Sequence, residues 1–187
     1  MNVMSMAEQI GREMEISEKK RESVISTSRI IIRKTKKVIH AIHQQEDHRE
    51  AMKDLVKDVA VLVKDCDQEM MRNADDALME FAEACIFEAV VLNKDIPSYS
   101  DLGVTSRAWA LGLADSLGEI RRMILDLLLA GDSKRTEHLF KRMEDICEAV
   151  MSFDIPDAIL PIRRKQDVAR SVTEKTRTDL VYSCLRN

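Results

Sequence analysis

Glycine and proline are too scarce in this sequence for a fold built on strands and tight turns. The 187 residues include five glycines and three prolines, and aromatic residues make up 4% of the chain. Sheet-rich folds need turn glycines together with β-branched and aromatic strand residues. Leucine, alanine, methionine, glutamate, lysine and arginine dominate instead, and these residues favour helix. The sequence therefore excludes an all-β fold, leaves little room for alternating strands and helices, and predicts an all-α protein.

Length, hydropathy and cysteine placement define the broad class. A chain of 187 residues that is 45% hydrophobic can form one domain with a sizeable core, and it is too apolar for global disorder. No stretch approaches eighteen uncharged apolar residues, and no apolar signal core stands near Met1, so we expect a cytoplasmic protein without a membrane span. The cysteines argue against a thiolate metal site or a disulfide framework, because they lie far apart at Cys66, Cys85, Cys147 and Cys184.

Hydrophobic periodicity predicts a single-domain antiparallel bundle of about six to seven helices over residues 1–187. The first helix should begin near Ser17 or earlier and end at about Gln45, with residues 1–16 as a flexible or partly helical N-terminal arm. Its core stripe is expected at Val24, Ile31, Thr35, Val38 and Ile42. The other helices are expected at about residues 49–68, 68–93, 105–129, 133–153 and 161–185.

Four acidic residues stand out by their placement on two of these predicted helices. Glu80 and Glu83 lie three residues apart beside an apolar stripe. Asp115 and Glu119 lie four apart in a strongly apolar segment, where a buried carboxylate must be paired or metal-bound. Acids on adjacent helices could converge on a hard divalent cation, which prefers oxygen ligands and can activate water for attack on a phosphodiester.

A structural role is the alternative for the same four acids. The first two would be solvated, and the second two would pair with Arg121 or Arg122, since acids at these intervals are common in helices. Gly112 and Gly118 interrupt the second of the two helices. Each weakens a helix interior by about 1 kcal/mol relative to alanine, so we expect both at points of close backbone approach.

Basic residues gather on the first predicted helix. Residues 18–37 include eight basic and two acidic side chains. We define the basic stripe as the four that helical spacing brings to one face, namely Arg29, Arg33, Lys36 and Lys37. The stripe could follow a phosphate backbone, and so could a second basic group at Arg163, Arg164, Lys165 and Arg170. A solvated helix face is the alternative. His40 and His43 are expected to be polar residues on the helix, not metal ligands.

Several segments resemble one known family. The string Leu111-Gly-Leu-Ala-Asp115-Ser-Leu-Gly-Glu119-Ile-Arg-Arg-Met, followed by Ala130-Gly-Asp132, resembles the signature helix of the translin superfamily. Upstream, Glu80-Phe-Ala-Glu83 is similar to the Glu-x-x-Glu segment of translin-associated factor X. Residues 28–29, 35–43 and 164–167 agree with the same family, and the likeness covers roughly residues 19–182.

The resemblance implies an all-helical protomer that assembles into a closed, hollow homo-oligomer, such as an octamer, around single-stranded RNA or DNA. The translin-associated factor X branch implies in addition a Mg²⁺- or Mn²⁺-dependent endoribonuclease site. Its four acids correspond to Glu80, Glu83, Asp115 and Glu119, which would serve as metal ligands and catalytic residues, while the basic stripe would bind the strand.

Two departures from translin itself stand out. Translin is basic or apolar at several of the four acid positions, so this chain resembles the nuclease branch. Translin also carries basic nucleic-acid contacts where this chain has eight acids against one base over residues 65–88, which argues against DNA-end recognition of the translin type. The leading expectation is therefore a metal-dependent endoribonuclease that acts on single-stranded RNA. A non-catalytic oligomer that binds single-stranded RNA or DNA is the first alternative, and a structural helical assembly factor is the second.

Overall fold

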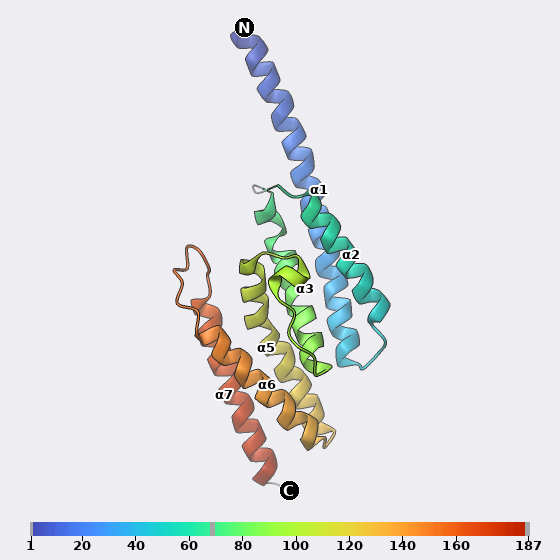
Figure 1. Cartoon of the computed structure of the whole chain (residues 1–187), viewed down its shortest axis with the longest axis vertical. Coiled ribbons are helices and arrows are strands. Elements are labelled where there is room, and N and C mark those ends of the chain that lie inside the picture. Colours follow the sequence, from blue (N-terminus) through green and yellow to red (C-terminus); the bar gives the residue numbers. More distant parts are fainter. Residues whose placement is uncertain (1, 68–69, 186–187) are drawn as a thin grey trace.

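The structure is a computed structural model that describes residues 2–67 and 70–185. These residues form seven helices and no strand, which confirms the all-α prediction (Figure 1). The helices are α1 (Val3–His43), α2 (Arg49–Asp65), α3 (Met71–Val91), α4 (Tyr99–Leu102), α5 (Ser106–Leu129), α6 (Ser133–Met151) and α7 (Arg163–Leu185).

Helices α3 and α5 form the centre of the bundle. They pack more extensively against each other than any other pair, with α1 and α2 flanking α3 and with α6 and α7 flanking α5. Figure 1 shows this order across the molecule. Both central helices are rich in alanine at buried positions, and small side chains let two helix backbones come close. The pair therefore brings the two predicted acid-bearing segments together.

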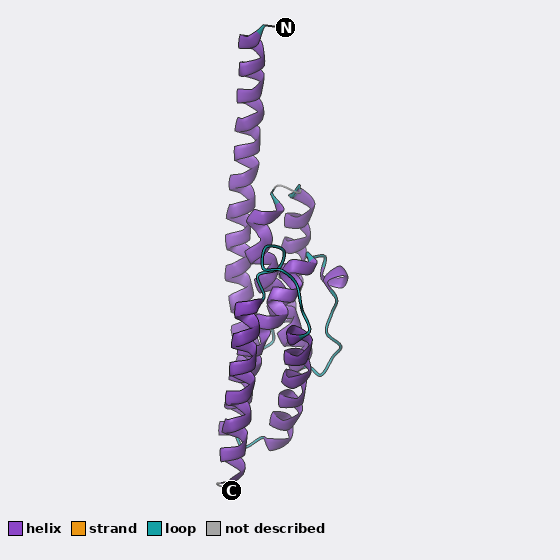
Figure 2. Cartoon of the chain, turned by 90° about the vertical axis from the view of Figure 1, so that its left-hand side faces the viewer, coloured by secondary structure: helices purple, strands orange, loops and turns teal. Residues whose placement is uncertain are grey.

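Helix α1 is a single helix of 41 residues, about 60 Å long at 1.5 Å per residue. Its C-terminal half packs in the bundle, and the predicted stripe of Val24, Ile31, Thr35, Val38 and Ile42 is buried there. We call residues 3–16 the N-terminal arm. The arm is helical, its side chains are exposed, and it projects well beyond the other helices (Figures 1 and 2).

Gly112 marks a close approach of α5 to α3. A Cβ atom at this position would lie 2.6 Å from the carbonyl oxygen of Met79 and 2.9 Å from the amide nitrogen of Glu83. The expectation for Gly112 is therefore confirmed. The same expectation is wrong for Gly118, which is exposed, and where an added Cβ atom would meet no atom of another described segment within 4 Å.

Helix ends differ from the predicted ones by a few residues, for local reasons. The chain turns into the left-handed region at Gln45 (φ 55°) and at Asn93 (φ 54°), so α1 and α3 end just before these residues. The short helix α4 was not predicted; its N-cap is Ser98, which forms a reciprocal capping box with Asp101. Thr105 caps α5 as predicted. The predicted boundary at Gln68 lies outside the described residues.

Of the helices that the structure describes, none combines the length and the apolarity that crossing a lipid bilayer requires.

Candidate functional site

The packing of α3 on α5 brings the four predicted acids into one neighbourhood, which we call the acid quartet. Glu80 and Glu83 come from α3, and Asp115 and Glu119 come from α5. The charges of Asp115 and Glu119 act on both α3 glutamates. A hollow of about 420 Å³ opens beside them, lined by Lys36, Ile39 and His40 of α1, Glu80 and Glu83 of α3, and Glu119 and Arg122 of α5.

The two α3 glutamates hold their protons unusually tightly. Burial raises the pKa of Glu83 to about 8, and the neighbouring charges of Asp115, Glu80 and Glu119 push it in the same direction. Burial also raises the pKa of Glu80, although the ammonium group of Lys36 opposes the rise. Protonation of these two glutamates therefore limits the negative charge of the site, and a bound cation would offset the same cost while they are ionised.

Asp115 is neutralised by a lysine from the far end of the chain. Nζ of Lys165 on α7 donates to both carboxylate oxygens of Asp115 and lies 2.6 Å from Oδ2. The two side chains are 27% and 31% exposed, so solvent only partly screens this pair. The predicted alternative partner, Arg121, instead donates to Asp179 and Thr176 of α7.

Glu119 is held mainly by a histidine. Nε2 of His43 lies 2.6 Å from Oε2 of Glu119, whereas a guanidinium nitrogen of Arg122 is 3.9 Å away from the same atom. The hydrogen bond from His43 lowers the pKa of Glu119, against the effect of burial. The structural alternative, a pairing of this acid with Arg122, is therefore only a weak contact.

His43 lies on α1 as a polar residue, as expected, but its burial was not predicted. Its side chain is 1% exposed, and its ring lies 4.9 Å, between centroids, from that of Phe87. The sequence did contain a signal for this burial, because residue 43 lies four positions after Ile39 on the buried side of α1. The role of Lys165 had no such signal, since it is 50 residues from Asp115.

The chemistry of the quartet suits a hard divalent cation. All four groups are carboxylates from two packed helices, and the two with raised pKa values have no basic partner at hydrogen-bond distance among the described residues. Within the same part of the chain, however, no three carboxylate, histidine or cysteine side chains are gathered closely enough to hold a metal ion as they stand. Binding of an ion by all four acids would therefore require side-chain rearrangement, including release of Asp115 from Lys165.

The basic stripe lies on the exposed side of α1. Arg29, Arg33, Lys36 and Lys37 are all exposed, and none of them makes an ion pair with another residue of the described chain. Lys36 also lines the hollow beside the acid quartet. The stripe is therefore available to an anionic partner, and it leads along α1 toward the acids.

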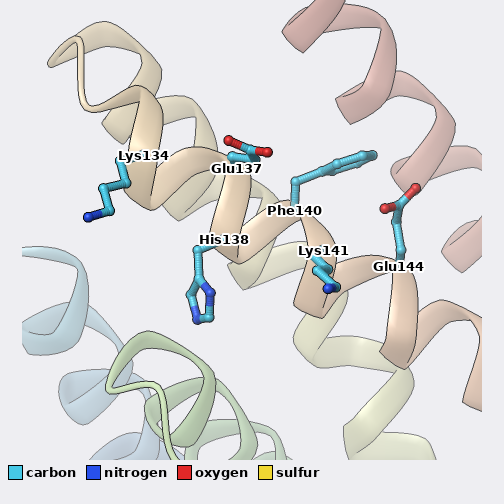
Figure 3. Close-up of a pocket in the computed structure, with 6 residues that line it drawn as sticks. All are labelled: Lys134, Glu137, His138, Phe140, Lys141 and Glu144. Atoms are coloured by element: carbon cyan, nitrogen blue, oxygen red, sulfur yellow. The ribbon is translucent and has the colours of Figure 1, made fainter.

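A larger hollow, of about 570 Å³, lies elsewhere on the surface. Figure 3 shows that its lining side chains all rise from α6. Lys134 and Lys141 alternate along it with Glu137 and Glu144, so their charges largely cancel. A groove on one helix with balanced charge offers neither a metal site nor a phosphate track.

Comparison with known proteins places the chain among relatives with the same fold. No family model matches it. An uncharacterized protein of Methanocaldococcus jannaschii is 32% identical over 167 residues, which cover 86% of this chain and 75% of that protein. The structure of C3PO from Archaeoglobus in complex with duplex RNA has a TM-score of 0.90 at 28% identity, and covers 97% of this chain and 98% of that one.

Two further solved structures agree. The crystal structure of the Archaeoglobus protein by itself has a TM-score of 0.86 at 29% identity, with 97% of this chain and 98% of that chain covered. The apo form of C3PO from Neurospora has a TM-score of 0.86 over 95% and 96% of the two chains. Its 19% identity makes that likeness one of fold alone.

Proposed function

This chain belongs to the translin superfamily, as its likeness to the translin-like C3PO structures at 28% and 29% identity indicates, and on that premise we propose that it is an endoribonuclease that uses Mg²⁺ or Mn²⁺ inside a hollow homo-oligomer. The observation that carries the proposal is the acid quartet. Four carboxylates from two packed helices share one neighbourhood, and the pKa of Glu83 is raised to about 8 by burial and by the other acids. Such an arrangement is costly unless a cation or a proton compensates it.

In this proposal the acid quartet and the basic stripe have different roles. Glu80, Glu83, Asp115 and Glu119 would hold the ion, which would polarise the scissile phosphate and supply the attacking hydroxide. The basic stripe on α1 would bind the sugar-phosphate backbone, since its side chains are exposed and without ion pairs in the described chain. Lys36, which belongs to the stripe and also lines the hollow, would bring the strand to the acids.

RNA is the proposed substrate. The Archaeoglobus relative, 28% identical, is known in a complex with duplex RNA. The resemblance of the sequence to the translin superfamily implies single-stranded RNA, with single-stranded DNA as a further ligand. Labelled RNA of one sequence, offered both single-stranded and as a duplex, separates these substrates in the same assay.

The N-terminal arm supports the assembly of several copies. Its apolar residues Val3, Ala7, Ile10 and Met14 recur at alternating steps of four and three, in register with the stripe that is buried farther along α1, and the polar residues Ser17 and Arg21 stand between the two apolar runs. Ile10 is 54% exposed and Met14 is 61% exposed. A helix with this spacing buries its stripe against another helix, and the unpaired arm therefore fits a second copy of the chain.

A non-catalytic RNA-binding oligomer is the second candidate, and one observation favours it. Lys165 neutralises Asp115, and His43 is bound to Glu119, so half of the quartet is compensated without a metal ion. In this alternative the acids stabilise the bundle, and RNA binding depends on the basic stripe alone.

Substitution of two acids distinguishes the candidates. Glu80→Gln and Asp115→Asn keep side-chain size, and each should abolish most metal-dependent cleavage. RNA binding should be unchanged or tighter, because each substitution removes a charge that repels phosphate. Glu148→Gln, which removes an exposed carboxylate from α6, is the matched control and should cleave normally. Full metal-dependent cleavage by a folded Glu80→Gln, Asp115→Asn double variant would refute the nuclease.

A further inference from the structure

The imidazole ring of His43 is fixed both by packing and by a hydrogen bond. Nε2 lies 2.6 Å from Oε2 of Glu119. An ionised carboxylate can only accept a hydrogen bond, so Nε2 is the donor in this contact. The ring is 1% exposed and tilted against Phe87. A ring held in this way leaves the accepting oxygen little freedom to move.

The same ring is costly to bury, which indicates that the hydrogen bond has a role beyond packing. Nδ1 is buried and has no hydrogen-bond partner among the described residues; Oδ2 of Asp126 lies 3.9 Å away. A buried polar atom without a partner destabilises a fold, and an apolar side chain would fill this space without that cost. A histidine at this position is therefore explained by what it does to Glu119.

We propose that His43 is a positioning residue: it holds Oε2 of Glu119 so that the other carboxylate oxygen is presented to a divalent cation bound by the acid quartet. This inference rests on the proposed metal site. Carboxylates that bind a metal are commonly oriented by a hydrogen bond to the oxygen that is not engaged, and loss of such a partner weakens metal binding about 10- to 100-fold. His43 connects α1 to α5 at this point, so the basic stripe and the acid quartet would be aligned through one contact.

The chain contains a matched control for this test. His48, in the segment between α1 and α2, likewise contacts a glutamate, in this case on α3. Its Nε2 lies 2.8 Å from Oε1 of Glu88. Its side chain is 13% exposed and that of Glu88 is 22% exposed. The His48–Glu88 pair thus repeats the contact between a histidine and a glutamate at a place outside the acid quartet.

The experiment measures Mn²⁺ affinity of the full-length protein by calorimetric titration, without RNA and without any activity assay. His43→Phe keeps an aromatic ring against Phe87 and removes the donor, so Mn²⁺ affinity should fall about tenfold or more. His43→Gln retains a side-chain N–H that can reach Glu119, and it should recover most of that affinity. His48→Phe should bind Mn²⁺ as the wild type does. Circular dichroism checks that each variant is folded; if His43→Phe is not, His43→Leu, which also removes the donor, takes its place and should show the same loss of Mn²⁺ affinity.

A double-mutant cycle shows whether His43 acts through Glu119. In a Glu119→Gln background, His43→Phe should lower Mn²⁺ affinity by less than about twofold, because the group it positions is already absent. Wild-type affinity in the folded His43→Phe variant, or an equal loss in both backgrounds, would overturn the positioning role and leave the metal site standing. Failure of the wild-type protein to bind Mn²⁺ would instead overturn the metal site, and the positioning role with it.

Discussion

The close approach at Gly112 provides a quantitative test of how α3 and α5 are packed. In Gly112→Ala, the new methyl group would lie 2.6 Å from the carbonyl oxygen of Met79 and 2.9 Å from the amide nitrogen of Glu83. Both contacts are with main-chain atoms, so no side-chain rotation relieves them. Overpacking of this kind costs about 1–3 kcal/mol, and contacts with backbone favour the upper end of that range.

The helix propensity of alanine works in the opposite direction and sets the net value. Replacing a glycine in a helix interior gains about 1 kcal/mol. We therefore expect Gly112→Ala to lower the free energy of unfolding by about 2 kcal/mol. Gly118→Ala, on the same helix but with open space around the new methyl group, should raise it by up to about 1 kcal/mol. The two variants carry the same chemical change, so their difference of about 3 kcal/mol isolates the contact between the helices.

Thermal unfolding followed by circular dichroism, at one fixed protein concentration, measures this difference. For a chain of this size, 1 kcal/mol shifts Tm by about 2–4 °C. Gly112→Ala should melt about 4–8 °C below the wild type, and Gly118→Ala about 2–4 °C above it. Because the amide of Glu83 is one of the contacted atoms, Gly112→Ala should also weaken Mn²⁺ binding. Equal melting temperatures for the two variants would refute the packing argument.

Three further predictions concern charge and assembly. Glu83→Gln should be more stable than the wild type in metal-free buffer, by an amount that grows as pH rises from about 4.5 to 8 and reaches on the order of a few kcal/mol. The sign follows because the raised pKa means that the Glu83 carboxyl ionises at lower pH in the unfolded chain than in the folded one, so the wild type loses stability over this interval. Urea unfolding at pH 5 and pH 8 measures the stability difference between the two proteins. The same difference at both pH values would contradict the prediction. Replacing Arg33 and Lys37 by glutamine should flatten the slope of log affinity for RNA against log salt by about 1.4–1.8, as measured by filter binding, if both contact phosphates. Replacing Ile10 and Met14 by glutamate should reduce the mass seen by light scattering without loss of the folded bundle, and an unchanged mass would exclude the arm as an interface between copies.

Much of the fold could be predicted because it depends on local pattern. The stripe from Val24 to Ile42 repeats at helical spacing, and burying such a stripe requires only that another apolar surface be present. The start of α5 could also be predicted, because the hydroxyl of Thr105 accepts a hydrogen bond from the backbone N–H of Ala108, only three residues away. The four-residue helix α4 was missed because it has no hydrophobic period of its own.

Only half of the candidate site could be predicted from the sequence, because only that half depends on local spacing. The acids of the quartet stand out at intervals of three and four within their own helices, and the family resemblance grouped them. Their partners come from elsewhere: His43 reaches Glu119 from α1, and Lys165 reaches Asp115 from α7.

Sequence alone therefore determined the six long helices, the buried stripe and the candidate acids, because spacing along a helix decides which side chains share a face. Tertiary structure alone decided which acids are compensated and which are not. That distinction depends on burial and on charges tens of residues away in the chain, as the raised pKa of Glu83 and the lowered pKa of Glu119 show. It also separated two glycines of one helix: Gly112 faces α3 at contact distance, and Gly118 faces solvent.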